Sequence, residues 1–199
     1  MRGSSSIIER AIESGDIGNV KTAWEILDRH IESLANLSLD VLRYQQEGGA
    51  GINTRLNDIV RHVREFFTEK ARARAARIEV FLGDGVDPCN IDGKAVYRCL
   101  INLVSNSLDA CPLSEGMIIL KTVRTGKDEV MVEVSDNGRG MDESTKERVF
   151  ELFETTKPER GTGLGLPSVV DIVKHHNGRI EIDSDPGRGI TFRIYLKEI

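Results

Sequence analysis

The chain has 199 residues, of which 39% are hydrophobic and 30% are charged, and its formal net charge is −5. This length allows one domain with a full hydrophobic core and a smaller appendage, and an acidic chain without a basic recognition helix argues against a primary role in nucleic-acid binding. No apolar run has the length of a membrane span and the N-terminus lacks the apolar segment of a signal peptide, so we expect a cytoplasmic protein without membrane contact.

The first part of the chain predicts a helical region that precedes the main domain. Residues 1–5 are typical of an added leader and are left out of the fold. Residues 6–47 contain a short amphipathic stretch, a turn and then a long helix that starts near Asn19. The glycine-rich residues 48–52 are the expected linker to the next domain.

The long helix carries an apolar seam whose spacing alternates between three and four residues, as in a helix that packs against a partner helix. An amphipathic helix packed on its own domain would also fit this pattern. We favour packing between subunits, and therefore a homodimer, because one short helical remnant cannot cover so long a stripe. The seam consists of Trp24, Leu27, Ile31, Leu34, Ser38 and Val41.

Residues 53–199 are expected to form one domain that begins with a helix. Asn53 or Thr54 can cap this helix. The helix ends in the run ARARAAR, residues 71–77, whose arginines could bind phosphate or an acidic partner, although a solvated helix face is the commoner role of such a run. Its apolar face is formed by Leu56, Ile59, Val60, Val63, Phe66 and Phe67.

Apolar periodicity predicts helices and strands through the rest of this domain. The expected helices are 92–108, 147–153 and 164–176. The expected strands are 78–82, 117–124, 129–135, 179–184 and 190–196. The predicted fold class is α+β, a two-layer α/β sandwich in which helices cover one face of a mixed sheet, preceded by a helical hairpin remnant that forms a dimeric bundle.

Four short motifs in this domain make sense together as one nucleotide pocket. In chain order they are NLVSNSLDA (Asn102–Ala110), DNGRG (Asp136–Gly140), FELF (Phe150–Phe153) and GTGLGL (Gly161–Leu166). Each alone is a weak signal. Their order, with strand-like segments between the first two and a helix after the last, is a strong one.

The first motif places Asn102, Asn106 and Asp109 on one side of a helix, because they are spaced by four and three residues. Asn106 offers a neutral amide oxygen, which suits a Mg²⁺ ion that keeps water and phosphate oxygens as its other ligands. A lone helical asparagine more often faces solvent or caps a helix, but the glycine motifs downstream favour the metal.

In the second motif Asp136 ends a strand, and Gly138 and Gly140 allow the backbone to approach a flat ring closely. A buried carboxylate here can accept a hydrogen bond from the exocyclic amine of adenine. Guanine would place a carbonyl oxygen against the carboxylate, so the motif predicts adenine specificity. A tight turn is the plain alternative for Asp-Asn-Gly.

The last motif precedes a helix, so its backbone N–H groups can face phosphate oxygens. Thr162 can add a hydroxyl near the adenine or its waters, and the residues expected to line the phosphates are Gly161, Gly163, Leu164, Gly165 and Leu166.

Taken together, these motifs resemble the ATP-binding domain of sensor histidine kinases, in the superfamily that includes DNA gyrase and the mismatch-repair ATPases. The resemblance runs from about Asn53 to the C-terminus. It implies Mg²⁺ and ATP as cofactors, Asn106 as the metal ligand and a response-regulator receiver domain as partner. It also implies that ETTKPER, residues 154–160, is a lid whose Lys157 and Arg160 reach the phosphates, with Arg160 equally well read as a solvated charge.

Asn102 separates the branches of this superfamily. In the gyrase-like ATPases a glutamate occupies this position and acts as general base on water, which an amide cannot do. Phosphoryl transfer to a protein nucleophile is therefore favoured over hydrolysis. A superfamily ATPase, a serine-kinase anti-sigma factor and a nucleotide-binding module without transfer are the alternatives.

No histidine of the chain fits the pattern expected of the phosphate acceptor. The four histidines are His30, His62, His175 and His176. His30 lies in the seam helix but lacks the flanking pattern of the family, and too little chain separates it from residue 53. His175 and His176 lie at a helix C-terminus, where a cation complements the dipole. We expect the acceptor upstream of Met1, and we interpret Cys89, Cys99 and Cys111 as reduced structural thiols.

Overall fold

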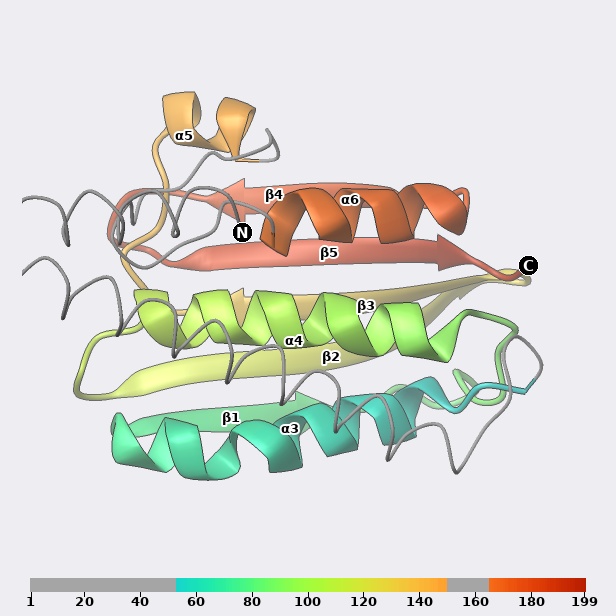
Figure 1. The fold of residues 1–199 in the computed structure, drawn as a ribbon, viewed down its shortest axis with the longest axis horizontal. Coiled ribbons are helices and arrows are strands. Elements are labelled where there is room, and N and C mark those ends of the chain that lie inside the picture. Colours follow the sequence, from blue (N-terminus) through green and yellow to red (C-terminus); the bar gives the residue numbers. More distant parts are fainter. Residues whose placement is uncertain (1–52, 150–164) are drawn as a thin grey trace, which may run out of the picture. The chain divides into compact units, whose positions relative to one another are not determined.

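The computed structural model describes residues 53–149 and 165–199. They form one five-stranded sheet with the order β1-β2-β3-β5-β4, in which β1 pairs parallel with β2 and the other pairs are antiparallel (Figure 1). The strands are β1 Ala76–Phe81, β2 Gly116–Gly126, β3 Glu129–Asp136, β4 Arg179–Ser184 and β5 Ile190–Lys197. The helices are α3 Leu56–Ala73, α4 Gly93–Ala110, α5 Glu143–Arg148 and α6 Gly165–His175.

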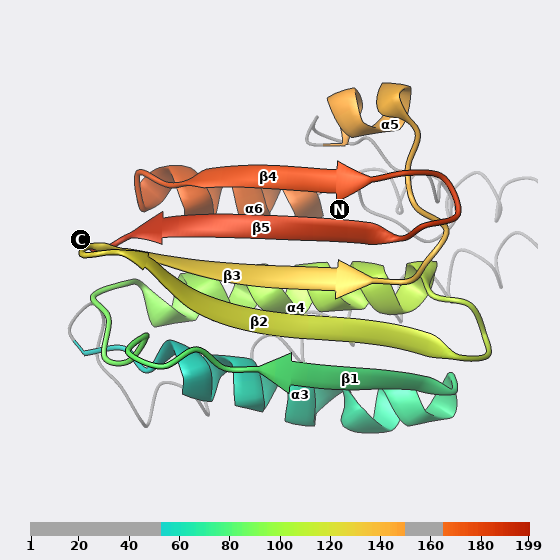
Figure 2. The same cartoon turned by 180° about the vertical axis from the view of Figure 1, so that it is seen from behind.

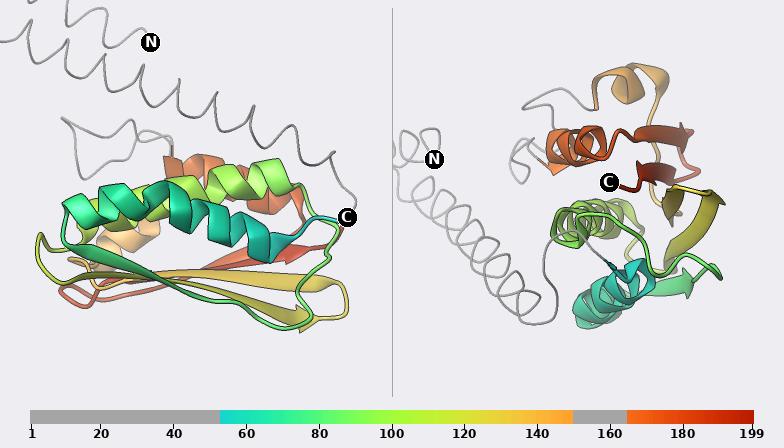
Figure 3. Two further views of the ribbon diagram at one scale, coloured as in Figure 1. Left: turned by 90° about the horizontal axis from the view of Figure 1, so that it is seen from below. Right: turned by 90° about the vertical axis from the view of Figure 1, so that its right-hand side faces the viewer.

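Three helices cover one face of the sheet, and the view from behind in Figure 2 shows the other face without a helix. Helix α3 packs on β1, α4 packs on β2 and β3, and α6 packs on β4 and β5. Helix α4 also contacts both α3 and α6, so it lies centrally in the helical layer. Figure 3 shows the two layers edge-on. The predicted two-layer sandwich is confirmed for these residues, whereas the N-terminal region 6–47 and the linker lie outside them.

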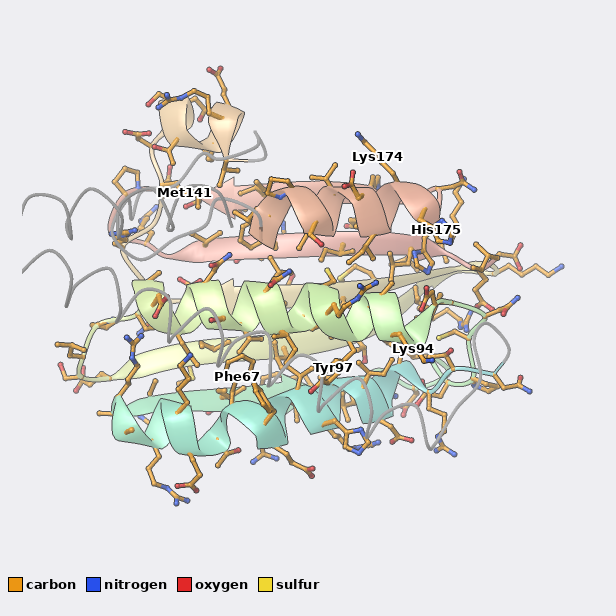
Figure 4. All side chains as sticks on the ribbon, in the orientation of Figure 1. Phe67, Lys94, Tyr97, Met141, Lys174 and His175 are labelled. Atoms are coloured by element: carbon orange, nitrogen blue, oxygen red, sulfur yellow. The ribbon has the colours of Figure 1, made fainter. Side chains whose placement is uncertain are left out.

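The core lies between the layers and follows the periodicities of the sequence. In β5 every second residue is buried, from Ile190 to Leu196, which is the pattern of a strand with one face in the core. Helix α4 begins after Asp92, whose side chain accepts a hydrogen bond from the backbone N–H of Ala95 at 3.0 Å. Phe67 of α3 and Tyr97 of α4, both labelled in Figure 4, are buried where these two helices meet.

The start of α3 and one of its apolar residues differ from the prediction. Arg55 is the N-cap residue, and its own side chain makes no capping bond. Asn53 has a positive φ of 65°, the Thr54 hydroxyl donates to Ile91, and the Asp87 carboxylate accepts from the backbone N–H of Asn57 in the first turn at 3.1 Å. Phe66 is 42% exposed, because the buried face of α3 contains Val63 and Phe67 and Phe66 lies beside this face. The predicted cap and the predicted burial of Phe66 are therefore wrong.

The short helix after β3 begins earlier than predicted. Helix α5 spans Glu143–Arg148, because the Asp142 side chain accepts from the backbone N–H of Thr145 and so caps a helix there. Of the predicted helix 147–153, residues 150–153 lie outside the described part of the chain. The arginine run also divides into two roles. Arg72 pairs with Glu69 on the exposed face, as expected, but Arg74 donates to the backbone oxygen of Leu108 at 2.7 Å and so binds α3 to the end of α4.

His176 connects the end of α6 to the start of α4. It is fully buried, its Nε2 accepts from the backbone N–H of Asp92 at 2.9 Å, and its Nδ1 lies 2.8 Å from the backbone oxygen of Ile172. Because an N–H must donate and a carbonyl must accept, Nδ1 carries the only proton, and the ring is neutral. The prediction of a structural role is confirmed, but His176 is not a cation at the helix end. His175 and Lys174 are exposed there instead (Figure 4).

Candidate nucleotide-binding site

The central side chain of the candidate site is Asp136, at the end of β3. It is only 7% exposed. One carboxylate oxygen accepts from the hydroxyl of Ser107 on α4 at 2.7 Å, and the other accepts from the backbone N–H of Gly138 at 2.9 Å. These two donors fix the plane of the carboxylate. With a further hydrogen bond from the backbone of Ile190, three of the roughly four lone-pair sites of the carboxylate are occupied, so the group can still accept one hydrogen bond from a ligand.

Burial raises the pKa of Asp136 above its usual value, and the hydrogen bonds from Ser107, Gly138 and the backbone of Ile190 lower it by less. Desolvation disfavours the charged form and donors favour it. The carboxylate is therefore kept in an apolar setting by specific donors, which is an arrangement found at binding sites more often than on structural surfaces.

The glycines of this loop are required by the protein's own backbone. A Cβ at Gly138 would lie 2.7 Å from the carbonyl oxygen of Ala110, at the end of α4. Gly140 has a φ of +69°, and a Cβ there would overlap the carbonyl oxygen of Asp185. The prediction explained these two glycines by the approach of a ring; their contacts show that close approach to α4 and to the β4–β5 turn also requires them.

Backbone hydrogen bonds hold the loop after Asp136 from both sides. Arg139 N–H donates to Ala110 at 3.2 Å, and the Arg139 oxygen accepts from Gly187 N–H at 2.7 Å. The side chain of Asn137 accepts from Met117 N–H at 2.8 Å and donates to the Glu115 oxygen at 2.9 Å. The loop is thus attached to α4, to the start of β2 and to the β4–β5 turn.

The predicted residues of α4 fall in two different settings. Asn102 and Asn106 are half-buried, and the Asn102 amide donates to the backbone oxygen of Gly165 at 3.4 Å. Asp109 is exposed, and its carboxylate forms an ion pair with Arg74 at 2.9 Å. Asn102 therefore lies toward α6, while Asp109 is held by a cation from α3.

The N-terminus of α6 joins the site through Gly165. A Cβ on Gly165 would approach the Asn102 side chain at 3.8 Å, so this helix begins in van der Waals contact with α4. Leu166 follows and is half-buried. The remaining predicted site residues lie outside the described residues, and so do Phe150 and Phe153. They are Lys157, Arg160, Gly161, Thr162, Gly163 and Leu164.

Two residues of the site were not assigned a role from the sequence. Ser107 donates to Asp136, and Asn137 fastens the loop to β2. The signal for Ser107 was its spacing of four and three residues from the buried Leu103 and Val104, which places it on the buried side of α4. No signal in the sequence identified the partners of Asn137, because Glu115 and Met117 are about 20 positions away.

Residues 53–149 and 165–199 contain neither a metal-binding cluster nor a membrane-spanning helix. These residues hold no group of three or more His, Cys, Asp or Glu side chains arranged for a metal ion. No helix among them is long and apolar enough to cross a membrane. Cys89, Cys99 and Cys111 are free thiols, and burial raises the pKa of Cys89 to about 11 and that of Cys99 to about 12, so the expectation of reduced structural thiols is confirmed.

The sandwich, the buried Asp136 and the α4–α6 contact together define an ATP-binding domain of the histidine kinase type. Residues 91–199, more than half of the chain, match the family described as histidine kinase-, DNA gyrase B- and HSP90-like ATPases. The chain belongs to this family.

Several curated sensor proteins and kinases resemble the chain. Sensor histidine kinase ZraS of Salmonella typhi is 31% identical over 144 residues, which cover 72% of this chain and 30% of that protein. Alginate biosynthesis sensor protein KinB of Pseudomonas aeruginosa is 32% identical over 187 residues, which cover 92% of this chain and 31% of that protein. The chain thus spans about a third of the length of these relatives.

Solved structures of histidine kinases share the fold. The nucleotide-free catalytic domain of histidine kinase ThkA is 29% identical, with a TM-score of 0.66, and the match covers 75% of this chain and 97% of that one. A structure of ThkA in complex with response regulator protein TrrA is 24% identical with a TM-score of 0.67, covering 100% of this chain and 58% of that one. At this lower identity the likeness concerns the fold alone.

Proposed function

We propose that the chain is the catalytic portion of a protein-histidine kinase, which binds Mg-ATP and transfers the γ-phosphoryl group to a histidine of a two-component phosphorelay. The observation that carries this proposal is the buried Asp136 carboxylate, held by Ser107 and Gly138 in a domain of the histidine kinase family. A buried carboxylate with a free lone pair fits the exocyclic amine of adenine. The carbonyl oxygen of guanine would leave both acceptors unpaired, so the site should reject GTP.

The metal and phosphates are assigned to α4 and to the segment that leads into α6. Asn106 is the proposed Mg²⁺ ligand, and a bound Mg²⁺ ion neutralises charge on the phosphates. Gly165 and Leu166 start a helix of 11 residues, whose first N–H groups suit an anion. The chain that precedes them contributes Lys157, Thr162, Gly163 and Leu164 to the proposed nucleotide site. Asp109 is the weakest member of the proposed set, because Arg74 already neutralises it.

Asn102 sets the direction of the reaction in this proposal. Its amide faces Gly165 and cannot remove a proton from water, so water is a poor nucleophile in this site. A histidine held in line with the γ-phosphoryl group is the better acceptor.

Neither the phosphate-accepting histidine nor the partner proteins are assigned to residues 53–149 or 165–199. His62 is exposed on α3 and His176 is buried as a neutral structural group, so neither is proposed as the acceptor. We propose an acceptor histidine on a helix that precedes this chain, a homodimer formed through residues 6–47, a response-regulator receiver domain as the next partner and a cytoplasmic location.

Two measurements test the proposal. Calorimetric titration with ATP, with and without Mg²⁺, and with GTP as control, should show Mg-dependent ATP binding that the Asp136→Asn variant loses. Incubation with labelled ATP and a separately supplied acceptor helix should then yield acid-labile phosphate. A folded chain that binds no ATP would rule out the kinase, and acid-stable phosphate would indicate the serine-kinase class instead.

A further inference from the structure

We propose that Ser107 is the positioning residue of the adenine site, because it orients Asp136 and keeps it in the charged form that accepts the adenine amine. This inference rests on the proposed function, since it concerns the same carboxylate. The Ser107 hydroxyl lies 2.7 Å from the carboxylate oxygen, and both side chains are buried, at 2% and 7% exposure. At this distance and burial the bond is a short, charge-assisted one that water cannot replace.

Ser107 is the one donor to Asp136 that a substitution can remove. The other carboxylate oxygen accepts from the backbone of Gly138, and every residue at that position except proline provides an N–H. Gly138 itself must remain glycine because of its approach to Ala110. The serine therefore determines how the carboxylate is turned and which lone pairs stay open for a ligand.

The charge state of Asp136 follows from the same contact. Burial raises the pKa of Asp136, and the hydrogen bond from Ser107 is the largest of the effects that lower it. The neighbours of Asp136 on the elements packed against it are Ser107 on α4, Ile118 on β2 and Ile190 on β5, none of which is charged. Cys111 also lies nearby, and burial, followed by the charge of Asp136, raises the pKa of its thiol, which is therefore neutral.

Loss of the hydroxyl should consequently act through pH. In a Ser107→Ala variant the pKa of Asp136 rises further, so a larger fraction of the group is protonated at mildly acidic pH. A protonated carboxyl has an O–H where the adenine amine needs an acceptor. ATP affinity should fall by about tenfold near the acid limb of the binding profile and recover toward the wild-type value at alkaline pH. A merely structural role of Ser107 would lower affinity equally at every pH.

The experiment uses the full chain with Ser107→Ala, with Ser107→Thr as the conservative rescue and with Ser105→Ala as control. Ser105 lies two positions earlier and so on another side of the same helix. ATP affinity is measured by calorimetry across the pH range, and circular dichroism confirms that each variant is folded. The expected result is an acid limb shifted to higher pH in Ser107→Ala only, with Ser107→Thr close to wild type.

A second readout needs no nucleotide. The ¹³C chemical shift of the Asp136 carboxyl, assigned by its absence in Asp136→Asn, reports the titration of this group in the free protein. It should titrate at higher pH in Ser107→Ala than in wild type. An unchanged titration overturns the inference, and so does a loss of affinity that is uniform with pH. Wild-type protein that binds no ATP while the carboxyl titration still shifts would refute the proposed function and leave the Ser107–Asp136 coupling established.

Discussion

The side-chain amide of Asn102, in the middle of α4, donates to the backbone oxygen of Gly165, the first residue of α6, at 3.4 Å. The bond is near the outer limit for a hydrogen bond, so its contribution to stability is small. Its consequence is positional. It sets the N-terminus of α6 beside the helix that carries Asn106, and under the proposed function it puts an amide rather than a general base beside the nucleotide.

An Asn102→Glu variant should therefore convert ATP to ADP and phosphate faster than wild type. A glutamate at this position can take a proton from water, and general bases contribute on the order of a hundredfold when they are well placed. We expect an increase of at least about tenfold in a phosphate-release assay, because the new carboxylate is not optimised. Asn102→Gln is the matched control, since a glutamine side chain is as long as a glutamate side chain but its amide cannot act as a general base. Equal rates for Glu and Gln variants that both bind ATP would contradict the prediction.

An Asp136→Asn variant should lose ATP binding and gain stability at alkaline pH. The pKa of Asp136 is raised in the folded state by burial, so its favourable contribution to folding is complete below the ordinary carboxyl pKa and is lost as pH rises through the raised value. Asparagine carries no charge to bury, and its amide can satisfy both Ser107 and Gly138.

Urea unfolding at pH 8 and pH 4 tests this sign. The variant should be the more stable protein at pH 8, and the difference should shrink toward pH 4. ATP affinity should fall by about a hundredfold, because a charge-assisted bond is replaced by a mismatched pair. A variant that is destabilised at pH 8 relative to pH 4 would show that burial is not the dominant influence on Asp136.

Two glycines of the β4–β5 turn form a matched pair for a packing test. Gly187 and Gly189 have φ angles of +77° and +82°, but a Cβ on Gly187 meets nothing within 4 Å, whereas a Cβ on Gly189 would overlap the backbone oxygen of Asp136. Gly187→Ala should cost about 1–2 kcal/mol through backbone strain alone. Gly189→Ala should cost about 3 kcal/mol or more, because overpacking is added.

Gly189→Ala should also weaken ATP binding, since the displaced backbone carries Asp136, the proposed adenine-binding carboxylate. Chemical denaturation and calorimetry of the two variants check both effects. Similar stabilities for the two variants would mean that the β4–β5 turn moves freely away from β3.

The adjacent histidines at the end of α6 provide a second matched pair. His176→Phe should destabilise the domain by about 2–3 kcal/mol, because the buried N–H of Asp92 loses its acceptor. His175→Phe should change stability by less than about 0.5 kcal/mol, since His175 is exposed. Thermal unfolding of both variants measures the difference. A mild effect at position 176 would indicate that water takes over the bond to Asp92.

The sequence predicted those parts of the fold that depend on local patterns. Strand β4 has the predicted bounds, and β3 and β5 differ by one residue at one end, because alternating apolar residues mark a half-buried strand directly. The family was also recognisable, since its motifs consist of short runs such as DNGRG. Local patterns did not predict the start of α5, because the Asp142 cap begins the helix before the apolar residues on which the prediction was based.

The contacts that complete the site could not be predicted from local patterns. Ser107 and Asp136 are 29 positions apart, and Asn102 and Gly165 are 63 positions apart. Arg74 was interpreted as part of a solvated face, yet it binds the end of α4. A polar side chain contacts such partners only after the tertiary fold brings them together, so the periodicity of apolar residues does not predict these contacts. The roles of Asn106, Lys157 and Thr162 stay predictions.

The pairing of β3 with β5 has a consequence for how the protein folds. Strands β2 and β3 form one hairpin and β4 and β5 form another, and each can close locally through a short turn. Asp136 meets Ile190 only when the two hairpins join, and that encounter closes a long stretch of chain, which is entropically costly and slow. We therefore expect the Asp136 carboxylate to be among the last groups to reach its place. A nascent chain with both hairpins but no pairing between β3 and β5 would lack the proposed ATP site, so we expect nucleotide binding to report the completed domain.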